Sequence, residues 1–137
     1  MQIKLLMCAM ILAATSCKTK KDECTGGDGG AVTVNLFPKH HSKIIYNQPA
    51  YKDTLYILYD TQDAPPLNSN LIPTRYDKML VGTGNEDHVH VSGLKCGDYY
   101  FYMTGIDTTG PYRVQGGVPF STDKVSGSID FEVPVTE

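Results

Sequence analysis

The chain has 137 residues, with 12 Lys or Arg and 15 Asp or Glu, so its formal net charge is -3. Hydrophobic residues make up 41% of the sequence and charged residues 20%. This length matches one domain of roughly 100 to 150 residues. The composition is too apolar for a disordered chain and lacks the basic excess of a nucleic-acid-binding protein. We therefore expect one small globular domain that has no nucleic acid as a partner.

The N-terminal segment has the three parts of a secretion signal. Lys4 gives it a charged start, residues 5–14 are mostly apolar, and small residues precede Cys17. An apolar stretch of this length is too short to remain as a membrane span, so we expect cleavage. The small residues end at a cysteine, which resembles the lipobox of bacterial lipoproteins. The resemblance implies a signal peptide over residues 1–16 and lipidation at Cys17, and the alternative is an ordinary secretion signal.

Lipidation at Cys17 would define both a partner and a location. Buried acyl methylenes contribute about 0.8 kcal/mol each, so two or three chains hold a protein stably on a bilayer. We expect the membrane to be a partner through this lipid anchor. The location is then the cell envelope, as an outer membrane lipoprotein on the periplasmic face or the cell surface.

The residues that follow the signal are polar and rich in glycine. Residues 17–30 are expected to be the lipidated cysteine and a flexible linker, because such sequence buries little apolar area. Within them, the Lys-Asp-Glu run at residues 21–23 resembles the surface-export signal of lipoproteins in the Bacteroidetes. A solvated linker of mixed charge is the alternative interpretation.

From residue 31 onward, apolar residues alternate with a period of two, which is typical of half-buried β-strands. In residues 31–37, Val32, Val34 and Leu36 share one face. The other alternating segments are residues 53–60, 87–94, 97–107, 112–118 and 128–135. Clusters of turn-forming residues separate these segments. Residues 31–137 therefore predict an all-β domain, a single antiparallel β-sandwich of six or seven strands with a prealbumin-like or immunoglobulin-like fold.

Two features of this domain carry further expectations. Residues 61–79 form an unusually long connection with three prolines, which predicts a functional loop or an excursion over one sheet edge. Pro134 has no N–H to donate, so the last strand is expected to end there or to lie at an edge.

The stretch HVHVSGLKCGDYY resembles a segment of carboxypeptidase-regulatory-like, or prealbumin-like, sandwich modules. The matching positions are Val89, Val91, Leu94, Gly97 and Tyr99, and Cys96 stands where proline is usual. The resemblance implies a sandwich in which the Leu and Tyr fill the core. Four shorter segments, namely the His-His pair, the GDYY segment, residues 114–119 and the closing VPVTE, also resemble uncharacterised lipoproteins of the Bacteroidetes. That resemblance implies a location and a fold, and no activity.

The four histidines form two clusters, His40 with His41 and His88 with His90. Residues i and i+2 of a strand project from the same face about 7 Å apart, so His88 and His90 could share a metal ion. Imidazole suits Cu(II), Zn(II) or Ni(II), and His40 or His41 would supply a third ligand if its loop lies beside this strand. The alternative is that the outward histidines are solvated and the His-His pair forms a turn, and partner contacts or pH sensing are a further option.

Two cysteines remain after lipidation, Cys24 in the linker and Cys96 in a turn. Outside the cytoplasm such a pair can oxidise, so a Cys24–Cys96 disulfide is one hypothesis. It would fasten the start of the domain to a hairpin. The alternative is that Cys96 is simply a small residue at a turn.

The sequence lacks the common catalytic motifs, including G-x-S-x-G, a phosphate-binding glycine loop and H-E-x-x-H. Nine tyrosines favour strands, and several on one exposed face would dock an envelope protein or stack on a glycan. We therefore expect no enzyme, and a lipid-anchored accessory or binding module of the cell envelope with no cofactor. The alternative is an envelope lipoprotein that binds Cu or Zn through its clustered histidines.

Overall fold

A computed structural model of the chain describes residues 24–137. The predicted signal peptide over residues 1–16, the lipidation site at Cys17 and the first part of the predicted linker lie outside the described residues. Among residues 24–137 there is no helix with the length and apolar character that a membrane span requires.

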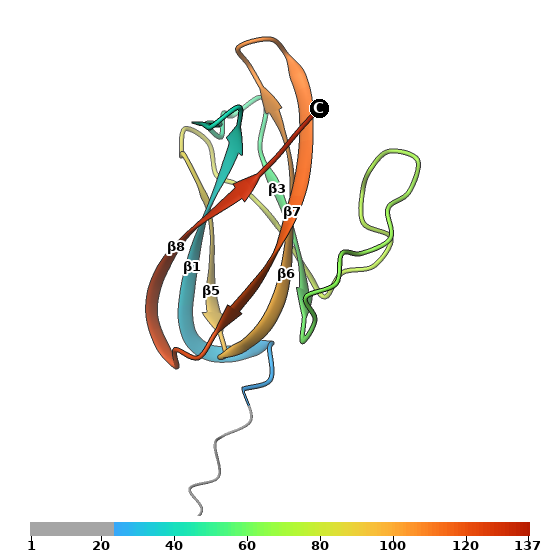
Figure 1. The fold of residues 1–137 in the computed structure, drawn as a ribbon. Helices are drawn as coiled ribbons and strands as arrows, with labels where there is room; N and C mark the ends of the chain where they lie inside the picture. The colour runs from blue at the N-terminus through green and yellow to red at the C-terminus, as the bar shows by residue number, and fades with distance from the viewer. Residues whose placement is uncertain (1–23) are drawn as a thin grey trace, which may run out of the picture.

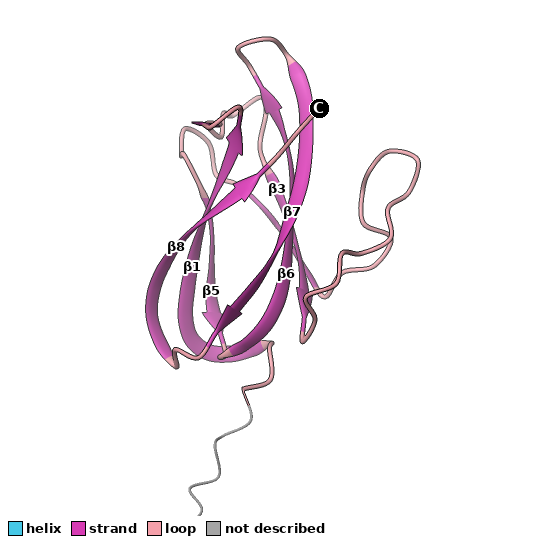
Figure 2. Cartoon of the chain, in the orientation of Figure 1, coloured by secondary structure: helices cyan, strands magenta, loops and turns pink. Residues whose placement is uncertain are grey.

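The described chain forms a β-sandwich of eight strands in two sheets (Figure 1). The strands are β1 (Asp28–His40), β2 (Lys43–Ile44), β3 (Thr54–Tyr59), β4 (Lys78–Val81), β5 (Val89–Leu94), β6 (Gly97–Asp107), β7 (Tyr112–Thr122) and β8 (Ser126–Pro134). One sheet is built around β1, which pairs with β2, β5 and β8, and the other has the order β4-β3-β6-β7. Figure 2 shows strands and loops only in this part of the chain. The prediction of an all-β sandwich is confirmed.

The core lies between the two sheets, as the alternating pattern predicts. On β1, Val32, Val34 and Leu36 are fully buried, while the residues between them are partly exposed. The facing sheet contributes the large fully buried side chains Leu55, Ile57, Tyr99, Phe101, Met103 and Val114. Burying a large apolar side chain contributes about 1.5–3 kcal/mol, so this shared interior holds the sheets together.

One strand pairing differs from the predicted antiparallel arrangement. Strand β8 runs parallel to β1, from the pair Ala31 and Ser126 to the pair Lys39 and Pro134, whereas the other strand pairings are antiparallel. The reason is topological: the chain leaves β7 in one sheet, turns at residues 123–125 and joins the other sheet in the direction of β1. Pro134 is the last residue of β8, and β8 pairs only with β1, as expected for an edge strand.

The start of the domain also differs from the predicted boundary at residue 31. Strand β1 begins at Asp28, and the Gly27 carbonyl already accepts a hydrogen bond from the Lys95 N–H at 2.9 Å. A side chain at Gly26 would collide with the Asp98 carbonyl, and one at Gly30 would collide with the Leu94 carbonyl. The glycines that suggested a linker instead permit close backbone contacts.

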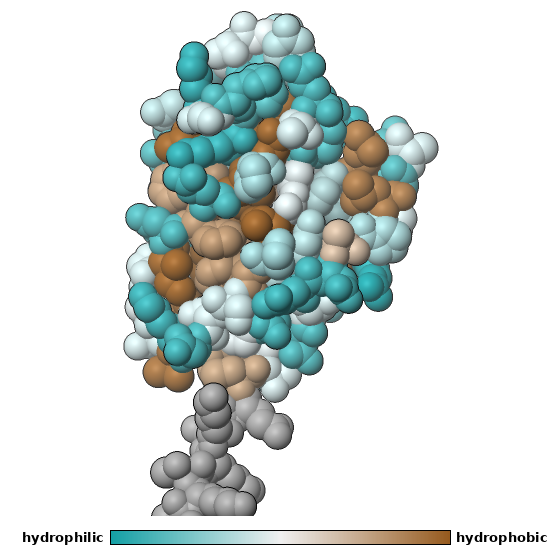
Figure 3. Space-filling model, viewed as in Figure 1, coloured by the Kyte–Doolittle hydropathy of each residue, from teal (hydrophilic) through white to brown (hydrophobic). Residues whose placement is uncertain are grey.

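Residues 60–77 form a long excursion beside the second sheet, at the right of Figure 1. The Tyr102 hydroxyl donates a hydrogen bond to the Leu71 carbonyl at 2.8 Å, and Arg113 donates to the Asn70 carbonyl at 3.0 Å. The loop therefore covers part of the outer face of this sheet and leads into the short edge strand β4. Figure 3 shows apolar residues on this loop, where Leu67 and Leu71 are exposed.

Candidate functional site

The sandwich has two different ends, and β1 runs from one to the other. Its thirteen residues extend over up to about 40 Å. Residue 24, where the described chain begins, lies at the lower end in Figure 1, and the C-terminal residue lies toward the upper end. The lower end contains the cysteines, and the upper end contains the His40 and His41 pair.

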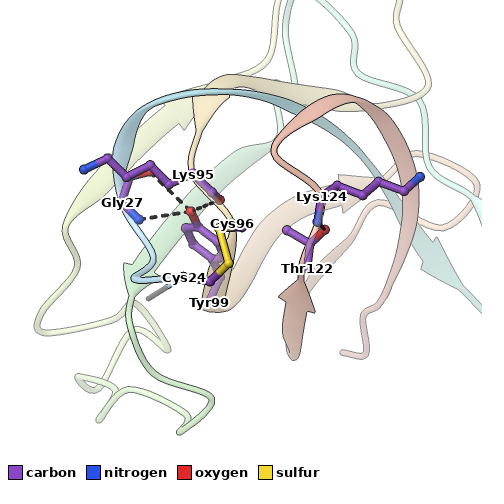
Figure 4. Close-up of a disulfide and its surroundings, with 7 residues drawn as sticks. All are labelled: Cys24, Gly27, Lys95, Cys96, Tyr99, Thr122 and Lys124. Atoms are coloured by element: carbon purple, nitrogen blue, oxygen red, sulfur yellow. Dashed lines mark hydrogen bonds between the residues drawn. A yellow bond between two sulfur atoms is a disulfide. The ribbon is translucent and has the colours of Figure 1, made fainter. Parts of the chain in front are cut away.

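At the lower end, Cys24 and Cys96 form a disulfide, the pair proposed from the sequence (Figure 4). Their Cα atoms lie 4.8 Å apart, and the bond spans 72 residues of sequence. Beside it, the buried Tyr99 hydroxyl accepts a hydrogen bond from the Gly27 N–H at 3.0 Å and lies 2.7 Å from the Lys95 carbonyl. This end is therefore fastened covalently and by hydrogen bonds.

At the upper end, His40 continues the inward face of β1. Its side chain is 4% exposed, in the same alternation as the buried Leu36 and Pro38. The chain then turns through His41 and Ser42, whose φ angles are 48° and 65°, and returns as β2. Two positive φ values are typical of a tight two-residue hairpin turn, so only the second histidine of the pair belongs to the turn.

His40 is held by Asp107, the last residue of β6. Its Nδ1 lies 2.7 Å from Asp107 Oδ2. The other carboxylate oxygen accepts hydrogen bonds from the Thr109 backbone N–H at 3.0 Å and the Thr109 hydroxyl at 2.7 Å. The hydrogen bonds from His40 and Thr109 lower the pKa of Asp107 to about 2. Asp107 is therefore an ionised acceptor that fixes the orientation of the His40 ring.

Glu137 reaches the same place because the C-terminal segment crosses between the sheets. The Val135 N–H donates to the Lys39 carbonyl, and Thr136 forms an isolated bridge with Gln115 of β7. A side chain at Gly116 would collide with the Pro134 carbonyl, so this glycine allows the crossing. Glu137 Oε1 then lies 3.7 Å from His40 Nε2 and 4.0 Å from His41 Nε2.

His40, His41 and Glu137 offer ligand atoms that all lie within 4.8 Å of one another. Among residues 24–137 they form the one group of three or more metal-ligating side chains at such distances. Asp107 and Glu137 were not singled out from the sequence. The alternation of buried residues, continued from Leu36 to His40, would have predicted that His40 is buried. The local sequence around Asp107 and Glu137 contains no pattern that would have placed them beside His40.

His88 and His90 do not join this group. His90 is exposed on β5 between the buried Val89 and Val91, as the alternation predicts, and His88 lies just before the strand. Their ring centroids are 6.1 Å apart, and His88 Nδ1 lies 2.7 Å from Asp87 Oδ1. The hypothesis that His40 or His41 joins His88 and His90 in one site is therefore not met by this geometry, because only His40 and His41 lie in the group with Glu137.

A buried acid, Asp53, lies against Gly105 of β6, two residues before Asp107. Asp53, just before β3, is 1% exposed, and neither of its carboxylate oxygens has a hydrogen-bond partner among the described residues. Burial raises the pKa of Asp53 to about 7. The buried Asn47 side-chain oxygen accepts the Asp53 backbone N–H at 2.8 Å, which fixes the loop before β3. This pair was not identified from the sequence, because Asp53 resembles an ordinary polar residue at the start of a strand.

The tyrosines of the second sheet do not form one open face. Tyr56 and Tyr102 are buried under the long loop, and the Tyr56 ring lies 5.1 Å from the ring of Tyr76. Tyr99 belongs to the core, and Tyr46, Tyr51 and Tyr112 are exposed. An aromatic platform of the kind expected for glycan stacking is therefore not assembled from these strand residues.

The fold and this geometry define a two-sheet β-sandwich with a histidine and carboxylate cluster at one end. Comparison with protein-family models, curated proteins and solved structures finds no match for the chain. The resemblance to prealbumin-like modules and to lipoproteins of the Bacteroidetes stays a prediction.

Proposed function

We propose that the protein is a lipid-anchored, non-catalytic binding module of the bacterial cell envelope. In this proposal Cys17 carries the acyl chains, and the anchored end of the domain is the one that contains Cys24. The observation that supports it best is the position of the Cys24–Cys96 disulfide, which lies at the end of the sandwich opposite His40. Its first cysteine, Cys24, follows Cys17 by only seven residues. The His40 end would then face away from the membrane.

The disulfide supports the envelope location for a chemical reason. Disulfides persist in oxidising compartments such as the periplasm and the cell surface, and they are rare in the cytosol. A signal peptide over residues 1–16 would deliver the chain to such a compartment. The outer membrane and a relationship to lipoproteins of the Bacteroidetes remain parts of the proposal that rest on the sequence.

The acylation site is tested by expressing the full chain in a bacterium that is fed an alkyne-labelled fatty acid. Wild-type protein should incorporate the label and partition into the detergent phase of Triton X-114. Cys17→Ala should lose both properties. Cys8→Ala is the matched control. Cys8 lies within the predicted signal peptide, so its replacement should leave labelling intact. Labelling that persists in Cys17→Ala, or that is lost in Cys8→Ala, contradicts the anchor at Cys17.

The direction of display has its own test. The two variants Ser42→Cys, at the end that contains His40, and Ser126→Cys, at the anchored end, are compared in chains that keep Cys17. A cysteine-reactive probe should label residue 42 at least as fast as residue 126. After release of the anchor by Cys17→Ala, the two positions should react with rates set only by their local exposure. Preferential protection of residue 42 in the anchored protein would mean that the opposite end faces the membrane.

A further inference from the structure

We propose that His40, His41 and Glu137 bind one divalent transition-metal ion, Zn(II) or Cu(II), at the end of the sandwich opposite Cys24. The three side chains come from the end of β1, the turn that follows it and the crossing C-terminal segment. The ligand set differs from the one expected from the sequence, because it replaces His88 and His90 by a carboxylate. The proposal depends on the envelope module only for its biological location.

His40 has the environment of a metal ligand with an outer partner. Metal-binding histidines commonly donate their second ring N–H to a carboxylate, which fixes the tautomer and the ring orientation. Asp107 accepts from His40 Nδ1 at 2.7 Å and is itself fixed by Thr109. This leaves His40 Nε2 with its lone pair on the side of the ring that lies near Glu137 Oε1.

The remaining ligands need only small movements to close around an ion. Bonds of about 2.0–2.2 Å in a tetrahedral site place ligand atoms about 3.3–3.6 Å from one another. The separations of His40 Nε2 and His41 Nε2 from Glu137 Oε1 are 3.7 and 4.0 Å, and no pair of ligand atoms in the group lies more than 4.8 Å apart. The side chains of His41 and Glu137 are 80% and 54% exposed, so they are free to make this adjustment against a fixed His40.

The donor set selects the class of metal. Two imidazoles with one carboxylate suit Zn(II) and Cu(II), whereas Ca(II) and Mg(II) favour sites made entirely of oxygen ligands. Cu(II) is expected to bind more tightly than Zn(II), following the general order of divalent-metal affinities. Three protein ligands leave a fourth position for water or for a group from a partner.

The alternative to a metal site is an ion-paired histidine, in which a proton on His40 Nε2 takes the place of the metal ion. A charged His40 imidazolium between Asp107 and Glu137 would also satisfy both carboxylates, since their oxygens lie 2.7 and 3.7 Å from its two nitrogens. In that case His41 would be a solvated turn residue and would contribute nothing to metal affinity. The effect of replacing His41 on metal affinity therefore distinguishes a metal site from an ion-paired His40.

The test is calorimetric titration of the full chain, purified in detergent with its free thiols alkylated, with ZnCl2 and with CuCl2. We expect one equivalent of metal with a dissociation constant in the micromolar range or below. His41→Ala and Glu137→Gln, which change exposed residues, should each weaken binding at least tenfold. Asp107→Asn, which changes a positioning residue, should weaken it about 10- to 100-fold. The His88→Ala, His90→Ala double variant is the matched control and should bind as wild type does.

A second measurement identifies the ligands independently of affinity. The electron paramagnetic resonance spectrum of the Cu(II) form should show nitrogen coupling from two imidazoles, and His41→Ala should reduce this to one. The absence of binding by both metals, or binding that is unchanged in His41→Ala, overturns the site. Because Cys17→Ala protein should bind metal as wild type does, loss of metal binding and loss of the anchor are distinguishable results.

Discussion

Tyr99 and Gly27 join two parts of the chain that are 72 residues apart in sequence. The Tyr99 hydroxyl accepts a hydrogen bond from the Gly27 N–H at 3.0 Å, and it donates toward the Lys95 carbonyl at 2.7 Å (Figure 4). The Tyr99 ring is fully buried between the sheets. One side chain therefore fills the core and satisfies two backbone groups beside the disulfide.

Tyr99→Phe should keep the ring packing and remove these hydrogen bonds. A buried polar group left without its partner costs about 1–3 kcal/mol, so the variant should be destabilised by about this amount. Urea denaturation followed by circular dichroism measures the difference. Tyr100→Phe, one residue along β6 and on its other face, is the matched control and should cost less than about 0.5 kcal/mol. Equal losses in both variants would show that the hydroxyl of Tyr99 has no special structural role.

The Cys24–Cys96 disulfide should stabilise the domain through the unfolded chain. Closing a loop of this length restricts the unfolded state by up to about 4 kcal/mol in the chain-entropy model. Cys24→Ala, Cys96→Ala and the double variant should therefore unfold at similar, lower urea concentrations, because each removes the same bond. Additive losses in the double variant would contradict this, as would a free thiol at either position in unreduced wild-type protein.

The sequence pattern accounts for most of the sandwich because alternation reports directly on burial in a half-exposed strand. The buried faces of β1, β5 and β6 follow the predicted positions, including Val34, Val91 and Phe101. Alternation does not report strand direction, however. The same apolar and polar order in β8 fits a parallel or an antiparallel neighbour, and only the passage of the chain from β7 to the other sheet decides it.

Only the histidines of the histidine and carboxylate cluster could be predicted from the sequence. Spacing within one strand favoured His88 and His90, because a period of two places them on one face. The cluster in the structure instead depends on contacts between distant segments, which bring Asp107 and Glu137 to the end of β1. Such convergence follows from strand lengths and from the crossing at Gly116, and no local motif encodes it.

The long loop should be fastened to the sheet by the hydroxyl of Tyr102. This group donates to the Leu71 carbonyl at 2.8 Å, and its ring is buried beneath the loop. In Tyr102→Phe, amides of residues 60–77 should exchange with deuterium faster than in wild type, while those of β6 should keep their protection. Tyr56→Phe is the matched control, because Tyr56 is buried on the same face and its hydroxyl makes no hydrogen bond to the loop backbone within residues 24–137. Unchanged exchange in Tyr102→Phe would contradict the fastening role.

Asp53 should make the stability of the domain depend on pH near neutrality. Burial raises its folded-state pKa from 3.8 to about 7, so between these values the folded state keeps a proton that the unfolded state has released. The contribution of Asp53 to the free energy of unfolding is therefore most favourable below about pH 4. It decreases as the pH rises from about 4 to about 7, and it stays constant at higher pH. Each unit of the shift corresponds to about 1.4 kcal/mol, which gives an effect on the order of a few kcal/mol.

Asp53→Asn removes this titration and should be more stable than wild type at pH 8, with the difference shrinking toward pH 5. Denaturation by urea at several pH values measures the difference between the two proteins, which cancels the contribution of groups common to both. Asp123→Asn is the matched control, because Asp123 is exposed on the turn before β8 and its replacement should change stability by less than about 0.5 kcal/mol. A difference between wild type and Asp53→Asn that does not change from pH 5 to pH 8 would mean that Asp53 is not protonated in the folded domain.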